Sequence, residues 1–169
     1  MKTHTRTLAL MGLLIAVQLV LTRFLVYQTP SLRIGFGFLP QAIGSMLFGP
    51  VLGAVQGVAE DLLGMLVAPR GVYFPGFTLS ALLTGAIYGL YLYKRPKTFL
   101  RIALAVLTVS VVVDLGLNTV WLSILLKQAA LVLLPGRLLK TAIMVPVQVG
   151  LIFGVWKGAV ERFERMTSR

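Results

Sequence analysis

The chain has no cysteine and a single histidine, His4, which lies in the polar N-terminal stretch. Without cysteine there are no disulfide bonds and no thiolate ligands for a metal. One histidine in a polar tail does not predict a zinc or haem site. We therefore expect no metal and no covalently bound cofactor.

Charged residues are also scarce, because they make up only 12% of the 169 residues and just five of them are acidic. Apolar residues make up 57%, and the mean hydropathy is +0.90. A soluble domain of this length needs far more polar surface, so the composition predicts an integral membrane protein. No low-complexity linker or charge block divides the chain, which predicts one membrane-embedded domain over residues 1–169.

Apolar stretches close to the length of a membrane-spanning helix recur along the chain. About 20 helical residues cross roughly 30 Å of hydrocarbon. Six candidates are separated by Pro, Gly and basic residues; their approximate limits are Leu8–Val26, Ile34–Phe48, Val51–Val67, Phe74–Tyr93, Ile102–Leu126 and Leu138–Trp156. The predicted fold is an all-α bundle of six transmembrane helices. Pro146 inside the last one predicts a kink. The first segment is too long for a cleavable signal peptide, so we expect it to be retained.

Basic residues indicate how the bundle is oriented. Six crossings with a cytoplasmic N-terminus place ten of the sixteen lysines and arginines inside, namely Lys2, Arg6, Lys94, Arg95, Lys97, Arg101, Lys157, Arg162, Arg165 and Arg169. This follows the positive-inside rule and predicts that both termini are cytoplasmic. The net charge is +11, but the basic residues lie between apolar segments and form no continuous basic face. We therefore expect no nucleic-acid partner.

The positive-inside rule does not account for the other six basic residues, Arg23, Arg33, Arg70, Lys127, Arg137 and Lys140, which fall near outer helix ends. Each alone is compatible with a side chain that extends to the interface. Together they favour a function. Arg23 lies about one turn inside the first segment, and Arg137 and Lys140 are three residues apart on one helix face. These three predict an anion site that opens to the outside.

Carboxylates and an amide inside apolar segments are the second unusual feature. Asp61, next to Glu60, lies in the third segment, and Asp114 and Asn118 are one turn apart in the fifth. Intramembrane carboxylates cost about 2.5 kcal/mol or more at a helix centre, so they are usually paired or functional. Pairing of either aspartate with a nearby arginine or lysine remains the alternative. Asn118 and Trp121 suggest a pocket, since an amide can bind a heterocycle edge and an indole can stack on its face.

Small residues recur at four-residue spacing in two places. One pattern is Gly12-x-x-x-Ala16 in the first segment, and the other is Gly49-x-x-x-Gly53-x-x-x-Gly57 at the start of the third. Such spacing allows two helices to approach closely. Packing within the bundle and docking of another membrane protein both remain open.

Longer blocks resemble the substrate-binding S components of energy-coupling factor (ECF) vitamin transporters, and within them the folate-specific members. The blocks run in the family's order over roughly positions 8 to 160: Leu32-Arg33-Ile34-Gly35-Phe36-Gly37-Phe38-Leu39-Pro40, Gly49-Pro50-x-x-Gly53-Ala54, Asp61-Leu62-Leu63-Gly64, and Pro69-x-Gly71-x-Tyr73-Phe74-Pro75-Gly76-Phe77-Thr78-Leu79-Ser80-Ala81. The family usually has two alanines four apart on its first helix, where this chain has Gly12 and Ala16. The departure is mild, because glycine also allows close approach.

The resemblance implies a non-enzymatic subunit of the bacterial plasma membrane. It would capture folate or reduced folates from outside and associate with a transmembrane coupling subunit and two cytoplasmic ATPase subunits. Consistent with that division of labour, the chain has no G-x-x-x-x-G-K-[ST] phosphate-binding loop. The family's first-helix contact with the coupling subunit would fall on Gly12 and Ala16.

Folate offers a planar pterin and two carboxylates, which suits this residue inventory. We assign Asp61 and Asn118 to the pterin edge and Phe74 and Trp121 to stacking. Arg23, Arg137 and Lys140 are assigned to the carboxylate or carbonyl groups, and Arg33 and Tyr73 to a lid.

Two other functions remain open at this point. One is an S component for a different vitamin, such as pantothenate. The other is an intramembrane enzyme, for which the sequence has no serine–histidine or paired-aspartate arrangement of plausible geometry.

Overall fold

The computed structural model describes residues 2–28, 33–69 and 71–160. The elements in chain order are α1 (Lys2–Arg23), β1 (Val26–Gln28), β2 (Arg33–Gly35), α2 (Phe38–Phe48), α3 (Pro50–Val67), α4 (Pro75–Leu92), α5 (Phe99–Thr108), the π-helix η1 (Val109–Leu117), α6 (Asn118–Leu126), α7 (Ala130–Val155) and the π-helix η2 (Trp156–Val160). Proline at the first position of α3 and α4 suits a helix start, because no hydrogen-bonded N–H is needed there. The helical elements confirm the predicted all-α class.

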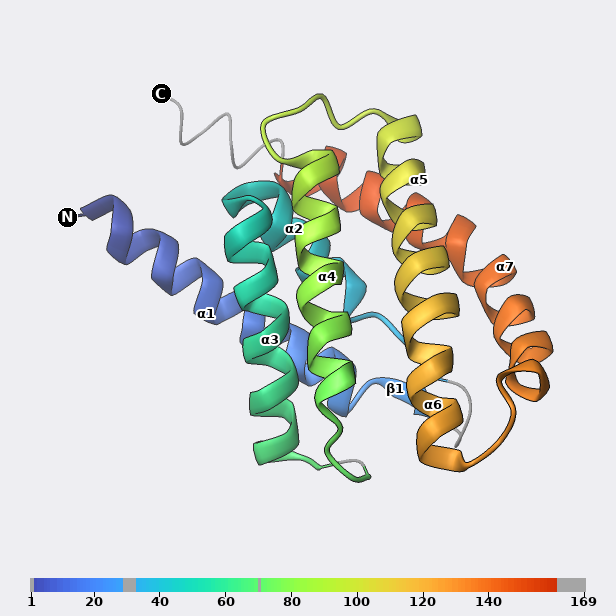
Figure 1. Ribbon diagram of the computed structural model, residues 1–169. Helices are drawn as coiled ribbons and strands as arrows, with labels where there is room; N and C mark the ends of the chain where they lie inside the picture. Colours follow the sequence, from blue (N-terminus) through green and yellow to red (C-terminus); the bar gives the residue numbers. More distant parts are fainter. Residues whose placement is uncertain (1, 29–32, 70, 161–169) are drawn as a thin grey trace.

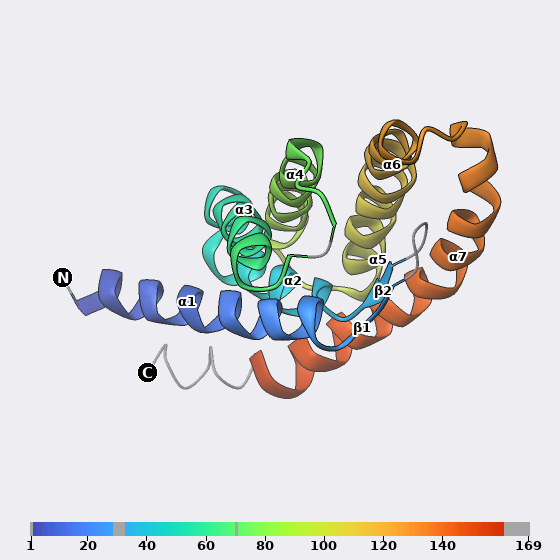
Figure 2. The same ribbon diagram turned by 90° about the horizontal axis from the view of Figure 1, so that it is seen from below.

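The helices form a row crossed by two oblique helices (Figure 1). α3, α4 and the continuous α5–η1–α6 rod stand side by side. The α4–α5 connection lies at the upper end of this row, and the α3–α4 and α6–α7 connections lie at the lower end. Figure 2 shows that α1 and α7 run along one side of the row and that the N-terminal half of α1 extends beyond it.

Glycines bring α3 and α4 into close contact. A Cβ atom on Gly57 would lie 2.4 Å from the carbonyl oxygen of Ala81, and one on Gly85 would lie 2.0 Å from that of Gly53. A Cβ on Gly89 would lie 2.3 Å from the Cα of Pro50. The glycine pattern at the start of α3 therefore serves packing within the bundle, and the alternative of a docking face there is wrong.

The apolar core lies at the upper end of the bundle, between α2, α4, α5 and α7. Its buried side chains include Met46, Leu92, Ile102, Ile152 and Trp156, which are 0–7% exposed. Large apolar side chains are also exposed on the outer faces, for example Val51 at 73% and Leu66 at 80%. Such a surface suits hydrocarbon, and the core leaves the lower half of the bundle free for polar groups.

Five helices of the described chain are long and apolar enough to cross a membrane, with limits Thr5–Arg23, Pro50–Val67, Pro75–Leu92, Phe99–Leu126 and Ala130–Gly158. The second predicted segment is the exception. It is helical only over Phe38–Phe48, which at 1.5 Å per residue is about 17 Å long.

The sequence-based helix limits are wrong at the hairpin and at the start of the last helix. Val26, the last residue of the first predicted segment, is the first residue of β1, since α1 ends at Arg23. Ile34 is the middle residue of β2, which pairs antiparallel with β1 through Tyr27, so the second segment begins as a hairpin. The last helix begins at Ala130 and not at Leu138, and it continues through Pro135 and Pro146 along a curved path (Figure 2). Apolar periodicity cannot reveal either feature, because short strands and helix starts depend on neighbouring elements.

Candidate functional site

A cavity of about 620 Å³ occupies the lower half of the bundle. Its volume is within the range of ligand pockets for small molecules. Helices α1, α2, α3, α4, η1, α6 and α7 contribute to it, and the hairpin and residues 71–74 border it. The lining residues are Gln18, Thr22, Arg23, Val26, Gly35, Gly37, Phe38, Gln41, Glu60, Asp61, Met65, Gly71, Val72, Tyr73, Phe74, Phe77, Ser80, Ala81, Thr84, Tyr88, Val109, Val113, Asp114, Asn118, Leu122, Leu125, Leu126, Arg137, Lys140 and Gln148.

Arg23 at the end of α1 is held against the last turn of α3. Its guanidinium donates to the carbonyl oxygens of Asp61 and Ala68, each at 3.5 Å, and the side chain is only 3% exposed. Gly64 makes room for it, because a Cβ there would lie 2.2 Å from Nη2. The cation therefore lies at a helix C-terminus, where the backbone dipole favours positive charge.

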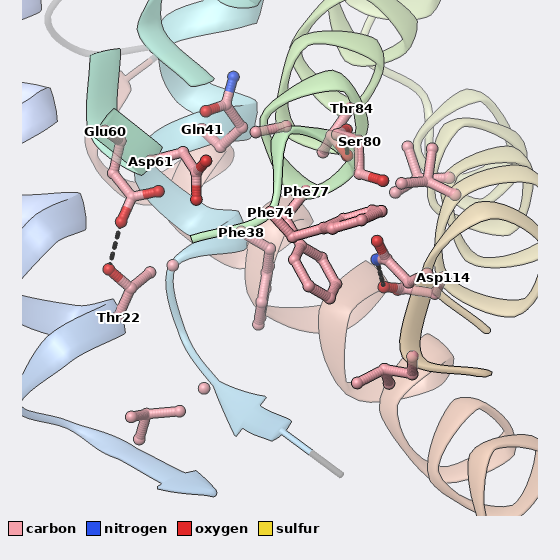
Figure 3. A pocket seen from close by; sticks show the side chains of 18 of the residues that line it. Thr22, Phe38, Gln41, Glu60, Asp61, Phe74, Phe77, Ser80, Thr84 and Asp114 are labelled. Atoms are coloured by element: carbon pink, nitrogen blue, oxygen red, sulfur yellow. Dashed lines mark hydrogen bonds between the residues drawn. The ribbon is translucent and has the colours of Figure 1, made fainter. Parts of the chain in front are cut away.

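The two adjacent carboxylates of α3 bind hydroxyl groups. Glu60 accepts a hydrogen bond from the Thr22 hydroxyl of α1 (Figure 3). Asp61 Oδ2 accepts from Thr78 Oγ1 at 2.6 Å, and Thr78 Oγ1 lies 3.1 Å from the Tyr73 hydroxyl. The predicted lid residue Tyr73 is thus connected to Asp61 through one hydroxyl group.

The opposite wall combines a π-helix with an arginine of α7. Arg137 Nη2 donates to the carbonyl oxygen of Asp114 at 2.5 Å, and Asn118 Nδ2 donates to the Asp114 carboxylate at 3.3 Å. Arg137 Nε and Asn118 Oδ1 are buried and have no hydrogen-bond partner within the described part of the chain. π-Helical turns frequently occur at functional sites, and this one contributes Asp114, whose backbone carbonyl oxygen and carboxylate bind Arg137 and Asn118.

Aromatic rings lie between the two polar walls. Figure 3 shows Phe38 and Phe74 between Asp61 on one side and Asp114 on the other. Trp121 packs on Phe74 with ring centroids 5.6 Å apart and donates its Nε1–H to Ser80 Oγ at 3.1 Å. Trp121 itself is not among the lining residues, so in this structure it supports Phe74 from behind.

The structure brings most of the predicted site residues to one cavity. Six of the seven residues assigned to the ligand line it, namely Arg23, Asp61, Phe74, Asn118, Arg137 and Lys140, as does Tyr73. Asp61 and Asn118 do not lie together, since Asn118 is bonded to Asp114 across the cavity from Asp61. Their joint assignment to one ring edge is not supported by this placement. The side chain of Arg33 lies outside the described part of the chain.

Several polar lining residues were missed from the sequence. They are the glutamines and hydroxyl residues Gln18, Gln41, Ser80, Thr84, Tyr88 and Gln148, all within predicted apolar segments. The signal that drew attention to Asp61 and Asp114 would have found them, because any polar side chain in a membrane span needs a partner or a role.

The small residues of α1 point away from the cavity. Gly12 and Ala16 are exposed, and a Cβ on Gly12 would meet nothing within 4 Å. Neither residue lines the cavity.

Comparison with known proteins identifies the family. A model of the substrate-specific component of ECF transporters matches residues 6–161. The folate transporter FolT of Clostridium novyi (strain NT) is 47% identical over 156 residues, which cover 92% of this chain and 90% of the relative. The folate transporter FolT of Leuconostoc mesenteroides subsp. mesenteroides is 31% identical over 158 residues, which cover 90% and 85%.

A solved structure agrees with these relatives. The crystal structure of FolT bound with folic acid has 41% sequence identity and a TM-score of 0.86, covering 89% of this chain and 92% of that chain. The chain belongs to the family of substrate-specific components of ECF transporters.

Proposed function

We propose that this protein is the folate-binding S component of an ECF-type importer in the bacterial plasma membrane. The observation that carries the proposal is the 47% identity, over nine-tenths of both chains, to a folate transporter. The fold match to a folic acid-bound FolT supports the same ligand. Pantothenate is the less favoured substrate, because neither curated relative is a pantothenate transporter.

The chemistry of the cavity suits folate. A pterin and a benzoyl ring require aromatic surface, which Phe38, Phe74 and Phe77 provide. Two carboxylates require cations, which Arg23, Arg137 and Lys140 supply to the same cavity. We assign Asp61 and Asn118 to the hydrogen-bonding groups of the ligand at different parts of the cavity, Phe74 to stacking with Trp121 behind it, and Tyr73 and Arg33 to its cover.

The proposed topology has six passes with both termini in the cytoplasm. Following the chain in Figure 1, α1, α3 and α5–η1–α6 run downward, whereas α2, α4 and α7 run upward. The short α2 contributes the second pass together with the hairpin that precedes it. Lys94, Arg95, Lys97 and Arg101 lie in or next to the α4–α5 connection at the upper end, which the positive-inside rule assigns to the cytoplasm.

Energy for transport comes, in this proposal, from partner ATPase subunits through a transmembrane coupling subunit. The exposed Gly12 and Ala16 of α1 form the contact with that coupling subunit. Small residues at this spacing allow a partner helix to approach the α1 backbone closely.

Direct ligand binding tests the proposal. Purified protein in detergent, without nucleotide, is titrated with folic acid and, separately, with pantothenate by isothermal calorimetry. We expect saturable 1:1 binding of folic acid and none of pantothenate. A folded protein that binds pantothenate, or that binds neither compound, contradicts the proposed function.

The contact between Arg23 and Gly64 gives a sharper prediction. Gly64→Ala places a methyl group where the guanidinium lies, 2.2–2.6 Å from three of its atoms. The cation must move, so we expect folic acid affinity to fall about tenfold or more, equivalent to about 1.4 kcal/mol. The matched control is Gly154→Ala, where nothing lies within 4 Å and affinity stays unchanged. Equal affinity of the two variants would remove Arg23 from the binding site.

A further inference from the structure

Helix α1 is attached to the bundle mainly by side chains that also face the ligand cavity. Among its described side chains, three are less than a tenth exposed, namely Met11, Gln18 and Arg23. Only 11% of its apolar span is buried, compared with 22–33% in α7 and the α5–η1–α6 rod. Apolar packing therefore holds α1 less firmly than it holds the other long helices.

Three glutamines from three helices connect α1 to the bundle. Gln18 Nε2 of α1 donates to Gln41 Oε1 of α2 at 2.9 Å, and Gln56 Nε2 of α3 donates to Gln18 Oε1 at 2.8 Å. Gln41 in turn donates to the carbonyl oxygen of Gly53 at 2.8 Å. All three side chains are 0–5% exposed, where hydrogen bonds are strong and broken ones are costly.

The last turn of α1 fits closely against glycines of neighbouring elements. A Cβ on Gly37, just before α2, would lie 2.1 Å from the methyl group of Thr22. Gly64 leaves similar space for the guanidinium of Arg23. Gln18, Thr22 and Arg23 all line the cavity, so α1 cannot change its tilt without changing the cavity wall.

The docking residues lie on another side of the same helix. At about 100° per residue, Gly12 and Ala16 are about 120° and 160° around α1 from Gln18. Gly12 is also about one and two-thirds turns nearer the N-terminus than Gln18, and Ala16 is about half a turn nearer. A change in the tilt or rotation of α1 at the cavity therefore also moves the face that carries Gly12 and Ala16.

We propose that occupancy of the cavity sets the orientation of α1, and through it the presentation of the Gly12–Ala16 face to a membrane partner. A ligand that contacts Gln18, Thr22 or Arg23 favours one tilt of α1, because it binds that tilt more tightly than the others. This inference rests on the proposed function, since folic acid is the ligand that fills the cavity.

The absence of cysteine allows a direct test with spin labels. Leu8→Cys on the projecting part of α1 and Leu90→Cys on α4 place labels at side chains that are 72% and 60% exposed. The distance distribution is measured by double electron–electron resonance with and without folic acid. We expect the ligand to narrow the distance distribution and shift its mean. A reference pair, Val55→Cys on α3 with Leu104→Cys on α5, should give the same distance distribution with and without folic acid.

A second variant tests the glutamine connection. Gln56 bonds Gln18 and the carbonyl oxygen of Pro40 at 3.0 Å but does not line the cavity. In Gln56→Met we expect folic acid still to bind, within a few-fold of the parent, and the ligand-induced narrowing at Leu8 to be lost.

The same samples are titrated with folic acid by calorimetry. This measurement separates the proposed folate-binding function from the proposed effect of the ligand on α1. Bound ligand with an unchanged Leu8–Leu90 distribution in the parent overturns the inference and leaves the proposed function intact. Absence of binding overturns both. If Gln56→Met responds to ligand as the parent does, the glutamine connection is excluded as the route.

Discussion

Replacing Gly85 with alanine is expected to destabilise the protein by about 1–3 kcal/mol or more, the range for overpacking a closely packed interior. The added methyl carbon would lie 2.0 Å from the carbonyl oxygen of Gly53 and 2.4 Å from its carbon. Both atoms belong to the backbone of α3, so no side-chain rotation can relieve the contact. The helices must separate, and the wall of the cavity that α3 and α4 form separates with them.

Thermal unfolding of the purified protein in detergent, followed by circular dichroism, measures this effect. The matched control is Gly150→Ala in α7, where a Cβ meets nothing within 4 Å. There we expect unchanged or slightly increased stability, because alanine favours a helix over glycine by roughly 0.5–1 kcal/mol. If both variants unfold at the same temperature, the close α3–α4 contact does not exist in the protein.

Arg137→Ala is expected to give the largest loss of folic acid affinity. Its guanidinium donates to the carbonyl oxygen of Asp114 at 2.5 Å, and its buried Nε has no hydrogen-bond partner among the described residues. Truncating one partner of a buried charged contact costs about 2–5 kcal/mol, which corresponds to a roughly 30-fold to several-thousand-fold weaker Kd. Arg137→Lys retains the charge without the planar fork, so we expect an intermediate loss.

Calorimetry with two ligands identifies what Arg137 binds. Pteroic acid lacks the glutamate carboxylates, so Arg137→Ala should weaken folic acid far more than pteroic acid. Lys127→Asn is the matched control, because it removes a cation at the end of α6, outside the cavity lining, and asparagine tolerates the positive φ of 51° at this position. Equal weakening of both ligands would indicate that Arg137 acts by holding the π-helix at Asp114 and not by contacting carboxylates.

Some of the site could be read from the sequence because membrane spans make polar residues conspicuous. Arg23, Asp61, Asn118, Arg137 and Lys140 each interrupt or border an apolar segment, and all five line the same cavity. The environment supplies the reason, since a charge in hydrocarbon is retained only where it is paired or used. Glutamine and threonine carry a weaker signal, and so Gln18 and Gln41 were overlooked.

The partnerships of these residues could not be read in this way. Nothing in the spacing indicates that Glu60 binds Thr22 or that the indole of Trp121 lies behind Phe74 on Ser80. Each contact joins residues far apart in the chain, and their geometry depends on how the helices cross. The π-helix at Val109–Leu117 is equally hidden, because an apolar run has the same composition whether it is wound as α or π.

The sequence by itself determined that this is a membrane-embedded helical protein with cations and carboxylates inside the bundle, since hydrophobic length and the cost of buried charge act on each segment separately. Only the tertiary structure decided that the second segment begins as a hairpin, that the α3 glycines contact α4, and that Asp61 and Asn118 lie on different sides of the aromatic rings. It also decided which side of α1 faces the cavity and which side is left exposed. These features arise from contacts between segments that are distant in the sequence, so the composition of any one segment does not determine them.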